Sequence, residues 1–422
     1  MDMTPSIKLT VRAFLFAAVL FIGHASFGQG ARFMVGAAQR NINPDRDSLY
    51  MAGGDPDRPF IDVHDTLFVK AVHVSNDAED VTILSFDCIG LLLPTLEEIR
   101  REVTAALPGF HVAHIVMGST HTHSGPDVVG IWGHDHAHSG VNEAHMRKIV
   151  RQAADAIVDA YRNRQPAALE FAKGTHGEDW VKNISEPGEV DRDLTVLRFR
   201  NAKRKNIATI TNFACHPTIM DDARPSASAD YVWGYYQRLD SLQGGVNMFL
   251  QGSIGGWIQP EDVPSGFDNA YYYGSRLGAQ ALSLLSHAEK NTDGSIRFRS
   301  TPVVFPLKNP MFKMAADMGL IKRRFDSSVR SEIAYFTIGA ASFATHPGET
   351  VPELGKLTKA MMKGRGPKVV IGLGQDALGY ILKPYFFDPS RKIPHSEYLT
   401  GMSVGPETMG IILETLKRLS SD

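Results

Sequence analysis

The sequence has few cysteines and no excess of charge of either sign. Only 2 of its 422 residues are cysteine, so a disulfide framework or a thiolate metal cluster is not expected. The 44 Lys and Arg residues against 46 Asp and Glu residues give a formal net charge of −2. Without a basic surplus, a protein lacks the usual electrostatic means of binding nucleic acid or an anionic membrane. We therefore expect a small-molecule or lipid substrate of low charge, and no nucleic acid.

Long apolar segments are also missing. The longest apolar run, residues 13–22, has ten residues, whereas a helix needs about 20 to span a bilayer. Basic residues precede this run, and the small residues Ser26 and Gly28 follow it at positions suited to signal cleavage. We predict that residues 1–28 are a signal peptide rather than a membrane anchor. The protein is then exported, to the periplasm or outside the cell, with no transmembrane segment after cleavage.

Common nucleophile and nucleotide motifs are absent as well. The sequence contains no G-x-S-x-G elbow, no Walker motif and no strand-linked G-x-G-x-x-G. Cys88 and Cys215 lack the setting of a catalytic thiol; they either pair in an oxidising compartment or remain as two buried free thiols. Against these absences stand 16 histidines, which favour a histidine-based site.

Strand-like and helix-like segments alternate after the leader. This alternation predicts an α/β fold, with a layered mixed β-sheet core flanked by helices, in a single compact domain over residues 29–422. β-Branched and aromatic residues predict strands at residues 67–74, 81–87, 111–117, 194–199, 207–214, 246–250, 335–344 and 368–373. Helical spacing of apolar residues predicts helices at residues 94–107, 142–162, 271–289, 351–362 and 406–419.

Histidines and a carboxylate follow several of the expected strands. His121 and His123 follow one strand, and side chains two residues apart in an extended segment point to the same side. His216 follows a second strand, and Glu349 follows a third. Two imidazoles and one carboxylate are a common ligand set of catalytic zinc. Because ligands gather beyond the carboxyl ends of strands in open α/β sheets, we expect these residues to meet.

Each of these features has a structural alternative. The histidine pair is also compatible with hydrogen-bonded loop residues, and His216 with a histidine at the edge of the core. Glu349 is equally suited to the start of the helix expected near residue 351, where a negative charge is favourable. A second histidine cluster, at residues 134–138, is expected to form a lid or a solvated loop. The basic run at residues 322–324 is expected to form a solvated face.

Four short motifs resemble the neutral, non-lysosomal ceramidases. They are HTHSGP at residues 121–126, NFACHPT at 212–218, HPGE at 346–349 and GLGQDALGY at 372–380, in the family's order and at compatible spacings. The resemblance extends over essentially all of residues 29–422 and matches them to the family's N-terminal catalytic domain. The smaller C-terminal immunoglobulin-like domain of that family is expected to have no counterpart.

The resemblance implies a zinc-dependent amide hydrolase acting on an N-acyl lipid such as ceramide, or on a related conjugate. It assigns the Zn2+ ligands to His121, His216, Glu349 and Tyr380. It also assigns a further histidine to His123, which together with Tyr380 would orient or stabilise the reacting group. Zinc in such a site lowers the pKa of bound water toward about 7 and polarises the scissile carbonyl.

The glycine-rich segment departs from the family pattern. Relatives usually read close to GDVSPN there and carry a serine assigned to the attack, whereas this sequence reads GSIGGWIQP at residues 252–260. Gly256 stands in place of the aspartate, and the serine position falls near Ile258 or Gln259. A mechanism based on zinc-activated water needs no such serine. The alternatives are a ceramidase-like protein that binds a ligand without hydrolysing it, and a zinc hydrolase of an ester or a sugar-linked substrate.

Overall fold

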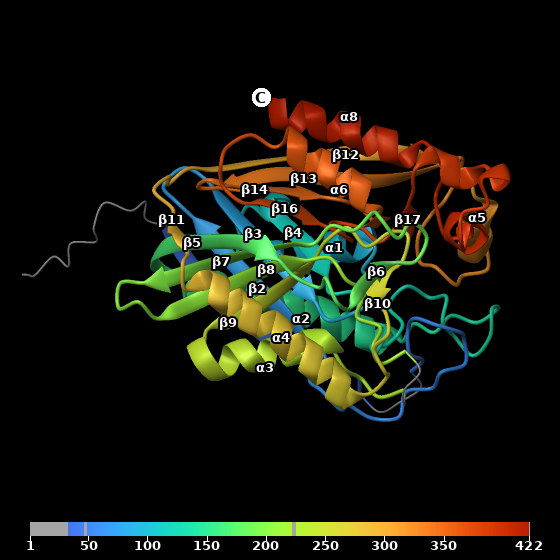
Figure 1. Ribbon diagram of the computed structural model, residues 1–422, viewed down its shortest axis with the longest axis horizontal. Helices are drawn as coiled ribbons and strands as arrows, with labels where there is room; N and C mark the ends of the chain where they lie inside the picture. The colour runs from blue at the N-terminus through green and yellow to red at the C-terminus, as the bar shows by residue number, and fades with distance from the viewer. Residues whose placement is uncertain (1–32, 46–48, 222–224, 422) are drawn as a thin grey trace, which may run out of the picture.

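Two β-sheets packed face to face form the centre of the molecule. The structure is a computed structural model that describes residues 33–45, 49–221 and 225–421. The expected signal peptide, residues 1–28, lies outside the described residues. Helices cover the outer face of each sheet, so the layers run helix, sheet, sheet, helix (Figure 1). The predicted α/β fold with layered mixed sheets is confirmed.

The larger sheet is mixed and carries the covering helices α1 (Leu93–Ala106), α2 (Glu143–Arg162), α3 (Tyr231–Gln243) and α4 (Phe267–Leu285). Its edge strand pairs on both sides are parallel, and the other pairs are antiparallel. In spatial order its strands are β4 (Ile115–Ser119), β3 (Asp80–Phe86), β2 (Phe68–Ser75), β1 (Phe33–Asn41), β5 (Gln165–Thr175), β7 (Asp193–Asn201), β8 (Asn206–Phe213) and β9 (Val246–Gln251), and β11 (Glu289–Lys290) also pairs with β5.

The smaller sheet has four strands and is covered by α6 (Pro352–Met361) and α8 (Thr408–Ser421). In order they are β12 (Ile296–Pro306), β13 (Ser328–Ile338), β14 (Ala341–Thr345) and β16 (Lys368–Ile371). Two short pairs lie apart from both sheets: β6 (Val181–Asn183) with β10 (Ile258–Pro260), and β15 (Glu349–Thr350) with β17 (Tyr380–Ile381). The remaining short helices are η1 (Val112–His114), α5 (Pro310–Asp317), η2 (Pro384–Phe387), η3 (Pro389–Arg391) and α7 (Ser396–Gly401).

Apolar side chains from both sheets fill the space between them. Phe336 of β13 stacks on Phe298 of β12 and on Phe343 of β14, with ring centroids 5.9 and 4.6 Å apart, and all three face the larger sheet. Residues alternate between the two faces of a strand. Tyr335 and Thr337 therefore turn to the opposite, outer face of the smaller sheet.

Most predicted elements lie within a few residues of the observed ones, but the strand predicted at residues 335–344 is wrong. It is two strands, β13 and β14, joined by a tight turn at Gly339 and Ala340. Gly339 has a φ of 57°, which glycine adopts at little cost. Two further predictions need correction: α4 begins at Phe267 and ends at Leu285, and residues 112–114 form η1 before β4 begins.

The basic run at residues 322–324 is not simply a solvated face, as its sequence suggested. The Arg323 side chain is only 5% exposed and forms a bidentate ion pair with the fully buried Asp376. Asp376 also accepts hydrogen bonds from Ser331 and from the backbone N–H of Leu93, where α1 begins. A buried carboxylate needs such partners, so Arg323 has a structural role.

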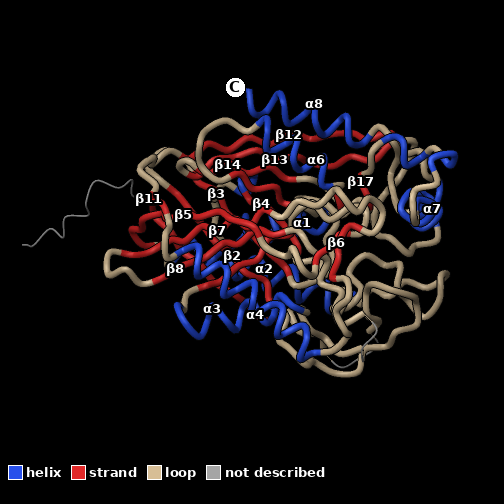
Figure 2. The backbone as a smooth tube through the Cα atoms, viewed as in Figure 1, coloured by secondary structure: helices blue, strands red, loops and turns tan. Residues whose placement is uncertain are grey.

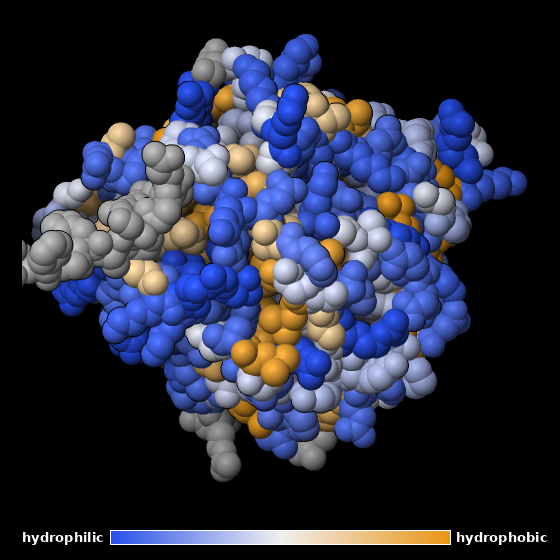
Figure 3. All heavy atoms as spheres, turned by 60° about the vertical axis from the view of Figure 1, so that its left-hand side comes forward, coloured by the Kyte–Doolittle hydropathy of each residue, from blue (hydrophilic) through white to orange (hydrophobic). Residues whose placement is uncertain are grey.

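Long loops gather at one end of the two stacked sheets (Figure 2). Gly372, just after β16, donates its N–H to the carbonyl of Gln251 at the end of β9, which joins the smaller sheet to the larger one. In the described ranges, no helix has the length and apolar content needed to cross a bilayer. The molecular face in Figure 3 is mostly hydrophilic, with apolar side chains in small patches.

Candidate metal centre

His121 leaves β4 in a conformation that aims its ring at the loops between the sheet ends. Its backbone φ is 68°, and the residue as a whole is only 4% exposed. Nδ1 is hydrogen-bonded to the carbonyl of Ile89. Because a carbonyl only accepts, Nδ1 carries the proton, and the lone pair of the neutral ring is on Nε2. Nε2 lies 3.5 Å from Oε2 of Glu349.

His216 is held in the same way by a different segment. Its backbone N–H and its Nδ1 both donate to the carbonyl of Ile258, at 2.7 and 2.8 Å. Nε2 therefore carries the lone pair of the neutral ring, and it lies 3.0 Å from Oε2 of Glu349. Histidine ligands of metals commonly donate their second nitrogen to a carbonyl in this manner, which orients the ring.

Glu349 brings a buried negative charge to these two imidazoles. Burial by itself would raise the pKa of its carboxyl, but His121 and His216 outweigh this effect and hold the pKa well below the usual range. The alternative position at a helix start is not observed, because α6 begins after Val351 and receives no side-chain cap. The carboxylate points to the two histidines, as a metal ligand would.

The donor atoms fit a divalent cation. Nε2 of His121 and Nε2 of His216 lie 3.5 and 3.0 Å from a carboxylate oxygen of Glu349, and these contacts are favourable only when a proton or a metal ion lies between the atoms. In a tetrahedral zinc site with bonds near 2.0–2.1 Å, neighbouring ligand atoms are about 3.4 Å apart. The separations around Glu349 match that spacing.

His123 lies beside these residues. Its Nε2 is 3.4 Å from Nε2 of His121, and its Nδ1 is 3.3 Å from Oδ2 of Asp221. Its ring packs on Gly53, where an added Cβ would lie 2.6 Å from the His123 side chain. In the described parts of the chain, the ligand atoms of His121, His123 and His216 lie within 4.8 Å of one another. His123 is therefore within reach of a metal ion or of a group bound to one.

Tyr380 completes the set of residues expected from the sequence. Burial and the adjacent Glu349 carboxylate, to which its hydroxyl is hydrogen-bonded, raise the pKa of Tyr380 well above its usual value. The hydroxyl oxygen accepts a hydrogen bond of 2.7 Å from Nε1 of Trp257. All five predicted site residues thus converge: His121, His123, His216, Glu349 and Tyr380.

Two features that support the site were not foreseen. Gln251, at the end of β9, is fully buried and donates from Nε2 to the carbonyls of Thr120 and Cys215, at 2.9 and 2.8 Å. These carbonyls immediately precede His121 and His216, so a single amide holds both histidine segments. The signal in the sequence was a polar residue ending an otherwise apolar strand.

The second feature is the glycine-rich segment at residues 252–260, which supports the site through three contacts. Trp257 donates a hydrogen bond to the Tyr380 hydroxyl, and the carbonyl of Ile258 accepts one from His216. Gly255 packs against the backbone of Glu349, where an added Cβ would lie 2.4 Å from the Glu349 carbonyl oxygen. The segment that departs from the family pattern therefore positions three of the predicted ligands.

Several other candidate residues lie elsewhere. His346 is buried, and its two ring nitrogens are hydrogen-bonded to the hydroxyls of Thr350 and Thr358. Burial lowers the pKa of His346 to about 3. Cys88 and Cys215 are buried free thiols, so the disulfide alternative is not observed. The loop at residues 134–138 is exposed, and His134 and His138 pair separately with nearby carboxylates.

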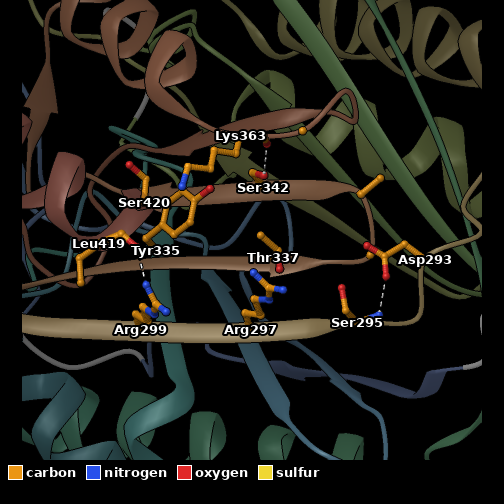
Figure 4. Close-up of a pocket in the computed structure, with 13 residues that line it drawn as sticks. Asp293, Ser295, Arg297, Arg299, Tyr335, Thr337, Ser342, Lys363, Leu419 and Ser420 are labelled. Atoms are coloured by element: carbon orange, nitrogen blue, oxygen red, sulfur yellow. Dashed lines mark hydrogen bonds between the residues drawn. The ribbon is translucent and has the colours of Figure 1, made fainter. Parts of the chain in front are cut away.

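A hollow of about 270 Å³ on the outer face of the smaller sheet is separate from this site (Figure 4). Two of its three basic residues are already engaged with the end of α8. Arg299 donates to the carbonyl of Leu419, and Lys363 donates to that of Ser421. Cations near a helix C-terminus stabilise it in this way, which accounts for Arg299 and Lys363.

The chain is similar in sequence to known ceramidases. The family model for "Neutral/alkaline non-lysosomal ceramidase, N-terminal" matches residues 33–235. Neutral ceramidase B of Dictyostelium discoideum is 29% identical over 144 residues, which are 29% of this chain and only 20% of that relative's length.

Two solved structures share the fold. The crystal structure of neutral ceramidase from Pseudomonas aeruginosa superposes with a TM-score of 0.76 and 18% identity, over 92% of this chain and 74% of that one. A ceramidase complexed with C2 gives a TM-score of 0.75 and 16% identity, over 92% and 75%. In its sequence motifs, in the match over residues 33–235 and in its fold, the chain is similar to the neutral/alkaline non-lysosomal ceramidases.

Proposed function

We propose that the chain is an exported, zinc-dependent hydrolase that cleaves the amide bond of an N-acyl lipid, such as ceramide, or of a related conjugate. One observation carries the proposal. His121 and His216 each commit Nδ1 to a backbone carbonyl and direct Nε2 at the same oxygen of Glu349. This arrangement is typical of a zinc site whose ligands are oriented before the metal binds.

The residues of this chain have distinct roles in the proposal. His121, His216, Glu349 and Tyr380 would hold the ion. When bound, Zn2+ would activate a water molecule and polarise the scissile carbonyl. His123, whose Nδ1 faces Asp221, would hold or pass a proton at Nε2.

Tyr380 would also act on the substrate. Because its pKa is raised, its hydroxyl remains protonated at neutral pH. When Glu349 binds the ion, this hydroxyl would be released from the carboxylate and would donate a hydrogen bond to the oxygen on which negative charge develops. The Trp257 N–H, which already occupies one lone pair of that hydroxyl, would keep the hydroxyl in place during the reaction.

Aromatic side chains beside Tyr380 support an apolar substrate group. The Trp257 ring lies 5.4 Å from that of Tyr398, which is half exposed and lies 6.3 Å from that of Tyr380. An acyl chain would bury apolar surface against these rings at about 25 cal/mol per Å². The near-neutral charge of the chain also suits a lipid or another weakly polar substrate.

Metal content and turnover test the proposal together. Purified protein should contain zinc and hydrolyse a short-chain fluorescent ceramide, and chelation should abolish turnover. H121A and H216A should each lose zinc and activity. The control H287A changes an exposed histidine after α4 and should retain both. The proposal fails if H121A or H216A leaves metal content and turnover intact.

Two alternatives are separated by the choice of substrates. The changed segment at residues 252–260 motivates a protein that binds its ligand without hydrolysing it. Zinc-dependent turnover of any member of a panel of ceramides, N-acyl amino acids and esters would eliminate that reading. Matched amide and ester substrates distinguish an amidase from an esterase. Export is tested separately, by fusing residues 1–28 to a reporter and locating it.

A further inference from the structure

A second group of histidines and carboxylates lies at the opposite end of β4. Its four members are Glu79, Asp80, His111 and His114, whose ligand atoms lie within 4.8 Å of one another. Asp80 opens β3, and His114 immediately precedes β4. His121 follows the other end of β4, so the five residues of this strand, roughly 16 Å, separate the two groups.

Local backbone structure holds the four side chains together. His114 donates its N–H to the carbonyl of His111 across the 3₁₀ turn η1, and residues three apart in such a turn lie on the same side. On the facing turn between β2 and β3, Asn76 accepts the N–H of Glu79 on its side chain and donates its own N–H to the Glu79 carbonyl. Both halves of the group are therefore fixed independently of any ligand.

The distances within the group resemble those around one ion. Nδ1 of His114 lies 3.0 Å from Oδ1 of Asp80 and 3.2 Å from Oε1 of Glu79. Nδ1 of His111 lies 3.2 Å from the same Asp80 oxygen. Four ligands around a tetrahedral zinc ion are about 3.4 Å apart, so a small outward movement would admit an ion.

Charge and accessibility also suit a cation. With both imidazoles neutral, Glu79 and Asp80 give the group two negative charges, which a divalent ion would balance. The His114 ring packs on Phe298 of β12, with centroids 4.5 Å apart, so its orientation is restricted. The His111 side chain is 58% exposed, which leaves a path from solvent.

We propose that Glu79, Asp80, His111 and His114 form a second metal site, which binds a divalent first-row transition ion such as Zn2+. Two imidazoles with carboxylates favour such an ion over Ca2+ or Mg2+, which prefer oxygen ligands alone. The bound ion would join the β2–β3 turn to the segment that enters β4. Its distance from the first centre makes its role structural rather than catalytic.

Zinc stoichiometry tests the second site. Full-length protein is stripped with chelator, dialysed to equilibrium against ZnCl2 and analysed for metal. We expect about two zinc ions per chain in the unmodified protein and about one in H111Q/H114Q. H134Q/H138Q is a matched control, because it removes two exposed histidines that pair with separate carboxylates, and it should bind as the unmodified protein does. Equal zinc content in H111Q/H114Q and the unmodified protein would overturn the proposal.

The test is independent of the proposed hydrolase activity. H121A/H216A should lose the other zinc ion and retain the one at this group, so failure of either site is recognised separately. A zinc-edge anomalous difference map of a zinc-saturated crystal of the unmodified protein requires no substitution. A peak among the four side chains supports the site, and its absence at saturation rules the site out.

Discussion

Glu349 and Tyr380 are direct partners in the two-residue parallel pair of β15 and β17. The N–H of Glu349 donates to the carbonyl of Gly379 at 2.9 Å, and the N–H of Leu378 donates to that of Pro347. Two sequence motifs that are separate along the chain are thereby joined through their backbones. The carboxylate and the phenol of the site are therefore brought side by side by main-chain pairing.

Tyr380→Phe should lower turnover while keeping the fold. The ring still fills its buried position, but the hydroxyl that meets Trp257 and Glu349 is lost. We expect kcat to fall about 10- to 100-fold, the usual effect of removing a group that supports a metal site. Steady-state kinetics and zinc analysis measure this. Unchanged kcat would contradict a role for the hydroxyl in the reaction.

Gln251→Leu should destabilise the protein and weaken zinc binding. It leaves the buried carbonyl of Thr120 without its donor and removes one of the two donors to the carbonyl of Cys215, which keeps the Tyr231 hydroxyl, at a cost of roughly 1 to 3 kcal/mol. Urea unfolding of the zinc-free protein gives the stability loss, and zinc titration gives the affinity loss. Gln280→Leu, at a partly exposed position on α4, is the control and should change zinc affinity little and stability less than Gln251→Leu does. Full zinc affinity in Gln251→Leu would show that this amide does not position the two histidines.

Gly255→Ala should disturb the site through the backbone. The new Cβ would lie 2.4 Å from the carbonyl oxygen of Glu349, so that segment must move. Overpacking of this kind costs about 1 to 3 kcal/mol, and displacement of Glu349 should reduce zinc affinity. Gly410→Ala on α8 has nothing within 4 Å and should be neutral or stabilising. Thermal unfolding and zinc titration of both variants test the difference.

Asp230 should make stability depend on pH. Burial raises the pKa of its carboxyl to about 7, against an ordinary value of 3.8. Between these values the folded protein holds a proton that the unfolded chain releases, so stability from this group falls as pH rises from about 4 to about 7. Asp230→Asn lacks this titration. Its stability relative to the unmodified protein should rise by about 1.4 kcal/mol per pH unit across that window. Urea unfolding at several pH values measures the trend, and a constant difference would contradict it.

The sequence alone indicated five candidate site residues and where the strands before them end. Apolar strands are easy to recognise in the sequence because their side chains pack on both faces of the sheet. The polar residues that follow them, such as His121 and His216, mark the edge of the core. The strand predicted at residues 335–344 failed because a two-residue turn between two apolar strands leaves little trace in the pattern. The helix α3 was not predicted, because its largely buried face carries no clear apolar and polar alternation.

Tertiary structure alone decided how these residues act together. The ring orientation of His216 depends on the carbonyl of Ile258, and Gln251 links two segments that lie 131 and 36 residues before it. The approach of Glu79 and Asp80 to His111 and His114 likewise arises from the pairing of β3 with β4. Contacts between distant segments follow from how elements pack, and no local pattern of residue types records them. The sequence therefore determines the chemistry available to this protein, and the fold determines which groups meet.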